Sequence, residues 1–253
     1  MTKKICFIGD SLTAGKCSYD WVKNIKRFFK NNNINYEVIN KANDGETSSV
    51  VRHRLKKDVI DLNPCIVVVM IGGNDIIGSV HKNAGPMYMQ MFPEIQTELP
   101  SIDGYRNEMN EIVKQLDEQL PSDTKIIIMS PPPIGEGGVE SEEWKIGEIC
   151  NDICINSVIK RNKTDTESNR IFSVNLYQMV KDDMIRFNCN KKLELSLYTI
   201  TKSRILSNFI GWKGVRYLNG FNYTTDGIHF CEEFGIICSE SIIQLLYGEN
   251  IIN

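Results

Sequence analysis

A serine stands near the start of the sequence, where a strand-like run meets a turn. The apolar run Ile5–Ile8 is typical of a buried strand, and it leads directly into Gly9–Gly15, which contains Ser11. In an open α/β sheet, ligands bind at the carboxyl ends of the strands. A serine hydroxyl is a poor nucleophile until a base removes its proton. Ser11 is therefore a candidate nucleophile if the chain also supplies a base.

Only three histidines, His53, His81 and His229, are available as that base. Asp226 precedes His229 by three residues, and one compact backbone turn can set both side chains on the same side. The carboxylate would then orient the imidazole and stabilise its protonated form. His53 lies between two arginines on a predicted helix and is expected at the surface. His81 falls in a long loop, where it is expected only to line a cleft.

Three groups could donate hydrogen bonds to the oxyanion that forms when a carbonyl is attacked. Asn74 follows the most apolar run of the chain, again at the end of a predicted strand. Gly45 lies after the second predicted strand, and a glycine can present its N–H with no side chain in the way. The backbone N–H of Ser11, at the start of a turn or helix, is the third candidate.

These residues resemble the SGNH hydrolases, a family named for Ser, Gly, Asn and His in four sequence blocks. All four blocks occur in order: Gly9-Asp10-Ser11-Leu12, Gly45, Gly72-Gly73-Asn74-Asp75 and Asp226-Gly227-Ile228-His229. The resemblance implies a flavodoxin-like α/β/α sandwich and hydrolysis of esters or related acyl compounds. It also implies a Ser11, His229 and Asp226 triad, with the oxyanion hole formed by Ser11 N–H, Gly45 N–H and Asn74. It implies neither a cofactor nor a metal.

A proline-rich run follows the fourth predicted strand. Ser130-Pro131-Pro132-Pro133 resembles the proline-rich loop of many SGNH esterases, notably those like isoamyl acetate-hydrolysing esterase. Proline fixes its own backbone dihedral and biases the preceding residue toward extended geometry. The run is therefore expected to stiffen a wall of the cleft, either as a rigid exit from the strand or in contact with substrate.

Strand and helix patterns alternate along the chain, which predicts a parallel α/β sheet in a three-layer α/β/α sandwich. The expected strands are Ile5–Ile8, Tyr36–Ile39, Cys65–Ile71, Lys125–Met129 and Ile171–Val174. The expected helices are Trp21–Lys30, Ser48–Asp61, Tyr105–Leu120 and Ser141–Arg161. The third strand lacks polar alternation, as expected of a central strand that is covered on both faces.

One domain over residues 1–253 is expected, with long irregular insertions at 76–104 and 177–223 and a polar surface loop at Lys160–Arg170. Long segments of this kind are often lids or binding loops. For the second insertion, packing helices at Met179–Phe187 and Leu193–Phe209 are an equally weighted alternative. Within the first, the apolar stretch Met87–Phe92 favours an acyl pocket slightly, although methionines more often pack in a core.

Composition limits the classes of molecule that the protein is expected to bind. The chain is 42% hydrophobic and 24% charged with a net charge of −3, and its basic residues form no dense run, so no nucleic acid partner is expected. No signal peptide and no apolar run near the roughly 20 residues of a membrane span are visible, which predicts a soluble cytoplasmic protein. The eight cysteines are then expected as free thiols. Cys150 and Cys154 could share a metal, but no second pair or nearby histidine completes the site.

The sequence thus favours a serine esterase that cleaves esters of small or lipid-like substrates through an acyl-enzyme. An acyltransferase or a carbohydrate deacetylase would use the same triad. A non-catalytic, flavodoxin-like module that cradles phosphate in Gly9–Gly15 is a further alternative. Asp226 and His229, which phosphate binding does not require, count against it, as does the lack of a basic residue in the loop before Lys16.

Overall fold

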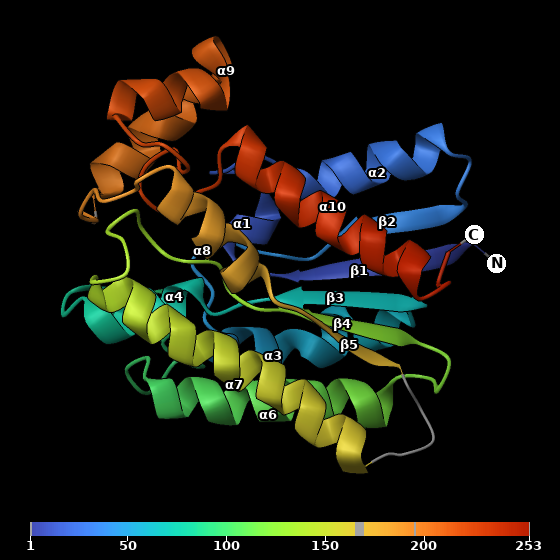
Figure 1. Ribbon diagram of the computed structural model, residues 1–253. Coiled ribbons are helices and arrows are strands. Elements are labelled where there is room, and N and C mark those ends of the chain that lie inside the picture. The colour runs from blue at the N-terminus through green and yellow to red at the C-terminus, as the bar shows by residue number, and fades with distance from the viewer. Residues whose placement is uncertain (1, 165–169, 195, 253) are drawn as a thin grey trace.

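A five-stranded parallel sheet forms the centre of the computed structural model, which describes residues 2–164, 170–194 and 196–252 (Figure 1). The strand order is β2-β1-β3-β4-β5. The strands are β1 (Lys3–Gly9), β2 (Tyr36–Asn40), β3 (Ile66–Met70), β4 (Lys125–Met129) and β5 (Ile171–Val174). This is the flavodoxin-like order, whose switch point lies between β1 and β3. All five strands lie where the apolar runs predict them.

Helices cover both faces of the sheet, as Figure 1 shows. On one face α2 (Trp21–Asn31) packs against α10 (Glu232–Gly248). On the other, α6 (Ile102–Gln119) packs against α3 (Ser48–Asp58) and α7 (Glu142–Thr164). A further helix, α8 (Leu176–Arg186), contacts both α7 and α10. The predicted α/β/α sandwich is confirmed.

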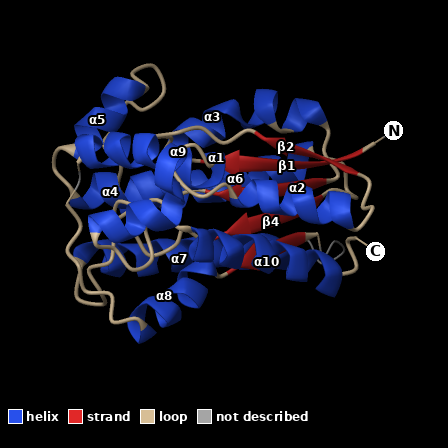
Figure 2. Cartoon of the chain, turned by 90° about the horizontal axis from the view of Figure 1, so that it is seen from above, coloured by secondary structure: helices blue, strands red, loops and turns tan. Residues whose placement is uncertain are grey.

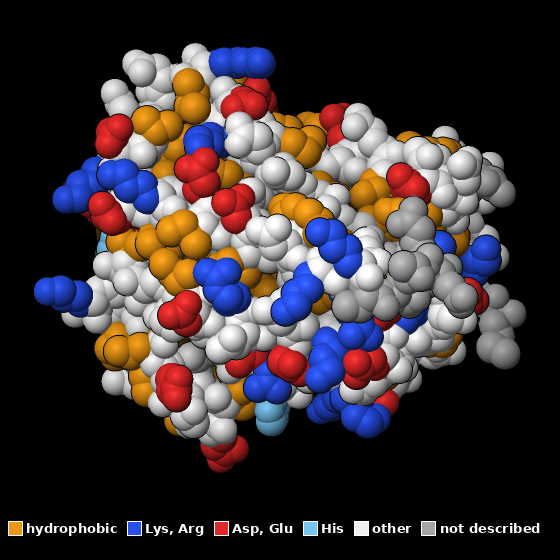
Figure 3. All heavy atoms as spheres, turned by 60° about the horizontal axis from the view of Figure 1, so that its bottom comes forward, with side chains coloured by type: hydrophobic (Ala, Val, Ile, Leu, Met, Phe, Trp, Pro, Cys, Tyr) orange, Lys and Arg blue, Asp and Glu red, His pale blue; other side chains and the backbone are white. Residues whose placement is uncertain are grey.

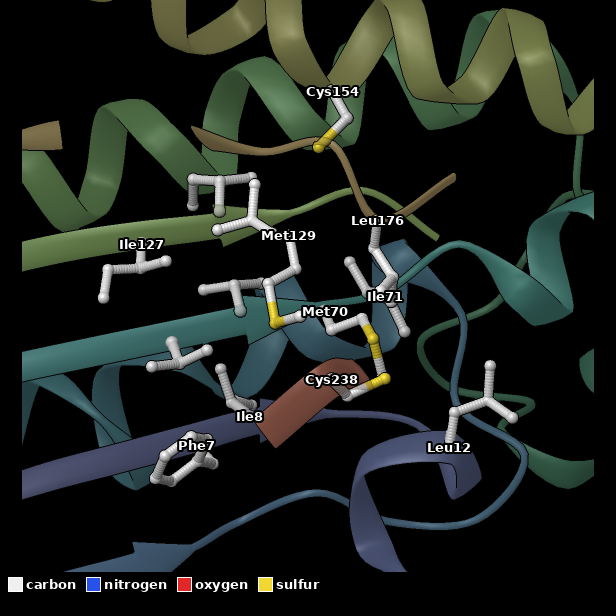
Figure 4. Packing of buried hydrophobic residues seen from close by; sticks show 14 of the residues in the cluster. Phe7, Ile8, Leu12, Met70, Ile71, Ile127, Met129, Cys154, Leu176 and Cys238 are labelled. Atoms are coloured by element: carbon white, nitrogen blue, oxygen red, sulfur yellow. The ribbon is translucent and has the colours of Figure 1, made fainter. Parts of the chain in front are cut away.

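The core fills the space between these layers. Every residue of β3 is buried, as the unbroken apolar run predicts for a central strand. In Figure 4, Cys154 of α7 and Cys238 of α10 both reach the apolar side chains that cover the strands. All eight cysteines are free, and burial raises the pKa of the Cys154 thiol to about 12. Cys154 and Cys238, both buried, serve as small apolar side chains.

The two segments expected to be irregular are largely helical. The first contains the end of α4 (Gly73–Val80) and all of α5 (Ala84–Met91), and the second contains most of α8 and α9 (Leu197–Asn219). Gly and Pro residues suggest a loop in the first segment, but burial of Ala84 and Tyr88 against the core stabilises α5. Helix α9 is broken at Gly211, whose φ of 67° is not helical.

Two predicted boundaries are also wrong. Helix α3 ends at Asp58 and a separate 3-10 turn follows at Ile60–Leu62. The polar segment Lys160–Arg170 is not simply a surface loop: α7 continues to Thr164, and Arg170 is buried in an ion pair with Asp117. A buried, paired arginine is indistinguishable from an exposed one by composition alone. Residues 165–169 lie outside the described residues.

Several helices gather at the carboxyl ends of the strands. Figure 2 shows α1 (Ser11–Ala14), α4, α5 and α9 at the end of the sheet to which the strand arrows point. The face in Figure 3 carries Lys and Arg side chains interspersed with Asp and Glu. In the described part of the chain, no helix combines the length and apolarity that crossing a membrane would require.

Candidate active site

Ser11 lies where the first strand passes into a short helix. Asp10 caps α1, because its carboxylate accepts a hydrogen bond of 2.9 Å from the backbone N–H of Leu12. Position 9, just before Asp10, must be a glycine, since a Cβ on Gly9 would lie 2.1 Å from the carbonyl oxygen of Met70. Close approach of β1 and β3 thus sets the position of Ser11, which is only 8% exposed.

His229 and Asp226 approach Ser11 from a loop between α9 and α10. The imidazole Nε2 of His229 lies 3.0 Å from the Oγ of Ser11. The other ring nitrogen, Nδ1, lies 2.7 Å from Oδ2 of Asp226. The second carboxylate oxygen, Oδ1, accepts backbone N–H groups from Ile228 and His229. The structure therefore brings together the three residues predicted as nucleophile, base and acid, in a hydrogen-bonded chain.

The surroundings of Asp226 and His229 favour the charged form of each side chain. Burial alone would raise the pKa of Asp226, but the charge and hydrogen bonds of His229 outweigh it and lower the pKa. Burial alone would lower the pKa of His229, but the charge and hydrogen bond of Asp226, together with the charges of Asp10 and Asp44, outweigh it and raise the pKa above 6.5. Such a histidine is a stronger base toward a serine proton than a free imidazole.

Asn74 lies in the first turn of α4, and its side-chain amide is held from both ends. Its Nδ2 donates a 2.7 Å hydrogen bond to the carbonyl oxygen of Glu46. Its Oδ1 accepts a 2.8 Å hydrogen bond from the hydroxyl of Tyr88, on α5. These partners fix which amide atom is nitrogen, and one of its two N–H groups is left for another acceptor. The sequence offers no signal for the contact of Tyr88 with Asn74.

Gly45 sits in a tight turn beside Asn74. Its φ of 79° lies in the left-handed region, and a Cβ would meet Cε of Met91 at 2.5 Å. Two sets of hydrogen bonds hold this turn in place. The carbonyl oxygen of Glu46 accepts the bond from the Asn74 amide. The buried carboxylate of Asp75 accepts hydrogen bonds from the backbone N–H (3.0 Å) and the hydroxyl (2.6 Å) of Ser48. Burial raises the pKa of Asp75 to about 6. The glycine and asparagine blocks thus form one unit beside Ser11.

A buried glutamate anchors the loop that carries Asp226 and His229. The carboxylate of Glu136 accepts backbone N–H groups from Asn222 (2.8 Å), Tyr223 (2.7 Å) and Thr224 (2.7 Å). Glu136 is fully buried and lies shortly after the proline run that follows β4. Glu136 thereby links the segment after β4 to the loop of Asp226 and His229, a contact that sequence reasoning misses because it spans more than 80 positions.

A pocket of about 510 Å³ opens beside Ser11. Gly45, Asn74 and His229 line it together with apolar side chains from three helices: Ile77 of α4, Ala84, Met87, Tyr88 and Met91 of α5, and Ile200 of α9. Both segments expected as insertions therefore contribute to this pocket. None of the described residues that line it is a lysine or an arginine.

The other histidines lie elsewhere. His53 is exposed on α3, as predicted. His81 follows α4, and its Nε2 lies 2.8 Å from Oε1 of Glu143 on α7 instead of lining the pocket. Across the described ranges, no three His, Cys, Asp or Glu side chains are grouped so that they could hold a metal ion.

Comparisons with known proteins identify the family and the fold. The model of the GDSL-like lipase/acylhydrolase family matches residues 7–157. No curated protein matches the sequence.

Solved structures share the fold at low sequence identity. The acetyl xylan esterase AlAXEase is 16% identical with a TM-score of 0.65, covering 96% of this chain and 99% of its own. A catalytic mutant of Axe2, an acetylxylan esterase from Geobacillus stearothermophilus, is 15% identical with a TM-score of 0.62, covering 96% and 93%. A lipase/acylhydrolase from Enterococcus faecalis is 17% identical with a TM-score of 0.60, covering 98% and 96%.

Proposed function

Since the chain belongs to the GDSL-like lipase/acylhydrolase family and is a serine ester hydrolase, we propose that it cleaves small-molecule carboxylic esters through an acyl-enzyme on Ser11. The observation that carries this proposal is the hydrogen-bonded chain from Ser11 through His229 to Asp226, with distances of 3.0 and 2.7 Å. A serine in this chain has both a base within reach and a group that orients the base.

In the first half of the reaction, Nε2 of His229 takes the hydroxyl proton of Ser11 while Oγ forms a bond to the ester carbonyl carbon. The negative charge moves to the carbonyl oxygen, where the N–H groups of Ser11, Gly45 and Asn74 stabilise it. The bond to the alcohol oxygen then breaks, and the proton held by His229 passes to that oxygen.

In the second half, His229 takes a proton from water, whose oxygen attacks the acyl carbon. Collapse of the second tetrahedral intermediate breaks the bond to Oγ, and the proton returns to Ser11. The acid leaves, and the resting state is restored. Asp226 keeps its charge throughout and stabilises the transient imidazolium.

A fluorophosphonate probe tests the nucleophile directly, because attack by Ser11 forms a phosphorus–oxygen bond and releases fluoride. We expect Ser11 alone to be labelled, and Ser11→Ala to lose both labelling and turnover of p-nitrophenyl acetate. Ser207→Ala, on α9 outside the pocket, serves as the control and should keep both. Undiminished turnover in Ser11→Ala with an unchanged melting temperature would overturn the assignment.

Carbohydrate deacetylation is a second candidate, favoured by the two acetylxylan esterases among the similar structures. It would use the same triad with an acetylated sugar as the ester. Comparing acetylated xylo-oligosaccharides with alkyl esters at equal concentration separates the two candidates. Analysis of the products with an added alcohol, thiol or sugar distinguishes transfer to that acceptor from hydrolysis.

A further inference from the structure

Helix α9 carries large apolar side chains that face solvent. Among its described side chains only Ser203, Val215 and Arg216 are buried, whereas α10 buries an apolar residue on every turn. Six large apolar side chains of α9 are exposed: Tyr198, Ile205, Phe209, Ile210, Tyr217 and Leu218. We propose that the exposed face of α9 binds the surface of a membrane that contains anionic lipids. The helix lies along the headgroup layer and does not cross the bilayer.

Three of these side chains form a stripe on the first half of the helix. Tyr198, Ile205 and Phe209 are separated by seven and four residues, a spacing that places them on one side of an α-helix. They are 76%, 56% and 81% exposed. Ser203 lies on the far side, where it is buried and accepts a hydrogen bond of 2.8 Å from Asn219. The helix therefore directs an apolar stripe outward, whereas an ordinary amphipathic helix directs it toward the core.

The position of α9 makes this stripe accessible to a large partner. Figure 1 shows the helix at one corner of the fold, away from the sheet. Single exposed apolar side chains are normal on a protein surface. Contiguous ones mark a contact with another protein or with a membrane. The stripe on α9 is of the second kind.

The charges of α9 are complementary to an anionic surface. Residues Leu197–Asn219 include two lysines and two arginines but neither aspartate nor glutamate, although the whole chain has a net charge of −3. Arg216 pairs with Glu233. The other three cations are exposed and make no ion pair within the described ranges: Lys202, Arg204 and Lys213. Cations among exposed apolar side chains are typical of helices that bind anionic lipid surfaces.

A second copy of the chain fits this face less well. In a symmetric dimer the same patch meets itself, so Lys202, four residues after Tyr198 in the stripe, would approach its own equivalent. Like charges brought together in this way oppose association. A membrane with anionic lipids is complementary to the apolar side chains and to the cations at once. The ring and hydroxyl of Tyr198 also suit the boundary between acyl chains and headgroups.

The stripe and part of the pocket lining belong to the same helix but to different sides of it. Ser196, which caps α9, and Ile200 line the pocket beside Ser11. Ile200 and Phe209 are nine residues apart, which places them on opposite sides of the helix. A membrane in contact with the stripe therefore lies against the side of α9 that faces away from the pocket. The inference concerns where the protein binds, and it does not depend on the activity of Ser11.

Flotation with lipid vesicles tests this inference. We expect the protein to float with vesicles of phosphatidylcholine mixed with phosphatidylserine, to float weakly with phosphatidylcholine alone, and to lose binding as salt is added. Phe209→Ser should weaken binding to the mixed vesicles about tenfold, because it removes an aromatic side chain that the lipid would bury. Lys202→Gln should weaken it about fivefold. Both side chains are exposed, so neither change should alter the melting temperature.

Two matched controls separate α9 from the rest of the surface. Helix α2 has no exposed large apolar side chain but carries four exposed cations: Lys23, Lys26, Arg27 and Lys30. Lys26→Gln should therefore leave binding unchanged, as should Ile159→Ser at an exposed apolar position on α7. Equal losses in Lys26→Gln and Lys202→Gln would show a general attraction of positive charge and would overturn the assignment to α9.

The outcomes also separate this inference from the proposed function. Ser11→Ala should float as the wild-type protein does. Binding that is unchanged in Phe209→Ser, or equally strong on phosphatidylcholine alone, would overturn the inference while labelling of Ser11 stands. A dimer in solution that Phe209→Ser dissociates would also overturn it, because a second copy would then cover the stripe. Failure of the probe to label Ser11 would overturn only the proposed function.

Discussion

The buried carboxylate of Glu136 accepts hydrogen bonds from both the backbone N–H and the hydroxyl of Thr224, at 2.7 and 2.9 Å. Thr224 stands two residues before Asp226, so Glu136, which does not line the pocket, holds the loop of the proposed acid and base. Two more backbone N–H groups share this carboxylate. The precision of the triad therefore depends on a residue outside it.

Glu136→Gln should weaken this anchor, because the carboxamide NH₂ would face backbone donors. Each buried N–H left without an acceptor costs about 1–3 kcal/mol. We expect a lower melting temperature and a lower kcat for p-nitrophenyl esters. Glu140→Gln, at an exposed glutamate on the same connection between β4 and α7, is the control. Equal kcat and melting temperature in the two variants would show that the anchor is dispensable.

The pH profile should report the coupling of His229 to Asp226. His229 acts as a base when neutral, so kcat/KM should rise with pH, with a midpoint above 6.5 because its pKa is raised. Asp226→Asn removes the charge that stabilises the imidazolium, so the midpoint should move to lower pH and kcat should fall about 10⁴-fold. A midpoint that stays in place would contradict the assignment of Asp226.

Tyr88→Phe should lower kcat about fivefold and change KM little. The ring that lines the pocket stays, whereas the hydrogen bond that orients the Asn74 amide, worth about 1 kcal/mol, is lost. Tyr19→Phe removes a comparable bond to Asn24, outside the pocket, and should leave kcat unchanged. A rise in KM without a fall in kcat would mean that Tyr88 contributes only to binding.

Gly45→Ala should impair turnover through backbone strain and a steric clash. A left-handed φ costs an alanine about 1–2 kcal/mol, and the new Cβ would meet Met91. Adding Met91→Ala removes the clash but not the strain, so rescue should be partial. Gly248→Ala, where a Cβ meets nothing within 4 Å, is the control. If Met91→Ala restored the turnover of Gly45→Ala completely, the backbone strain at position 45 would have no effect on catalysis.

Arg170→Met should reduce stability without reducing activity. Arg170 is buried against Asp117 just before β5, at the end of the strand away from the site, and it also donates to the carbonyl oxygen of Pro121. Because Arg161 still pairs with Asp117 when Arg170 is replaced, we expect a loss of about 1–3 kcal/mol. Exposed Arg186 pairs with Asp183, and Arg186→Met should cost about 0–1 kcal/mol. Denaturant unfolding measures both changes. Equal losses of unfolding free energy in the two variants would show that the buried ion pair contributes no more to stability than an exposed one.

The sequence predicts the sheet well because the strands are continuous apolar runs, a pattern that survives without tertiary information. The meeting of Ser11, His229 and Asp226 is also predictable, because the chain has only three histidines and only His229 has an aspartate three residues before it. The contacts that hold these residues in place are not predictable from the sequence. Tyr88 reaches Asn74 only because α5 folds back onto α4, and Glu136 reaches Thr224 across 88 positions. The sequence does not predict helix α5 because it contains Gly and Pro, which have low helix propensity. The burial of Tyr88 offsets this unfavourable propensity.

The hydrogen bond between Ser11 and His229 joins positions 218 residues apart. A nascent chain in which β1, α1 and β3 have formed already contains the proposed nucleophile, yet Ser11 lacks its proposed base until the loop before α10 has been synthesised and docked. During refolding, the return of turnover reports one specific long-range event, the docking of this late loop onto the first strand, more directly than any spectroscopic signal of helix content.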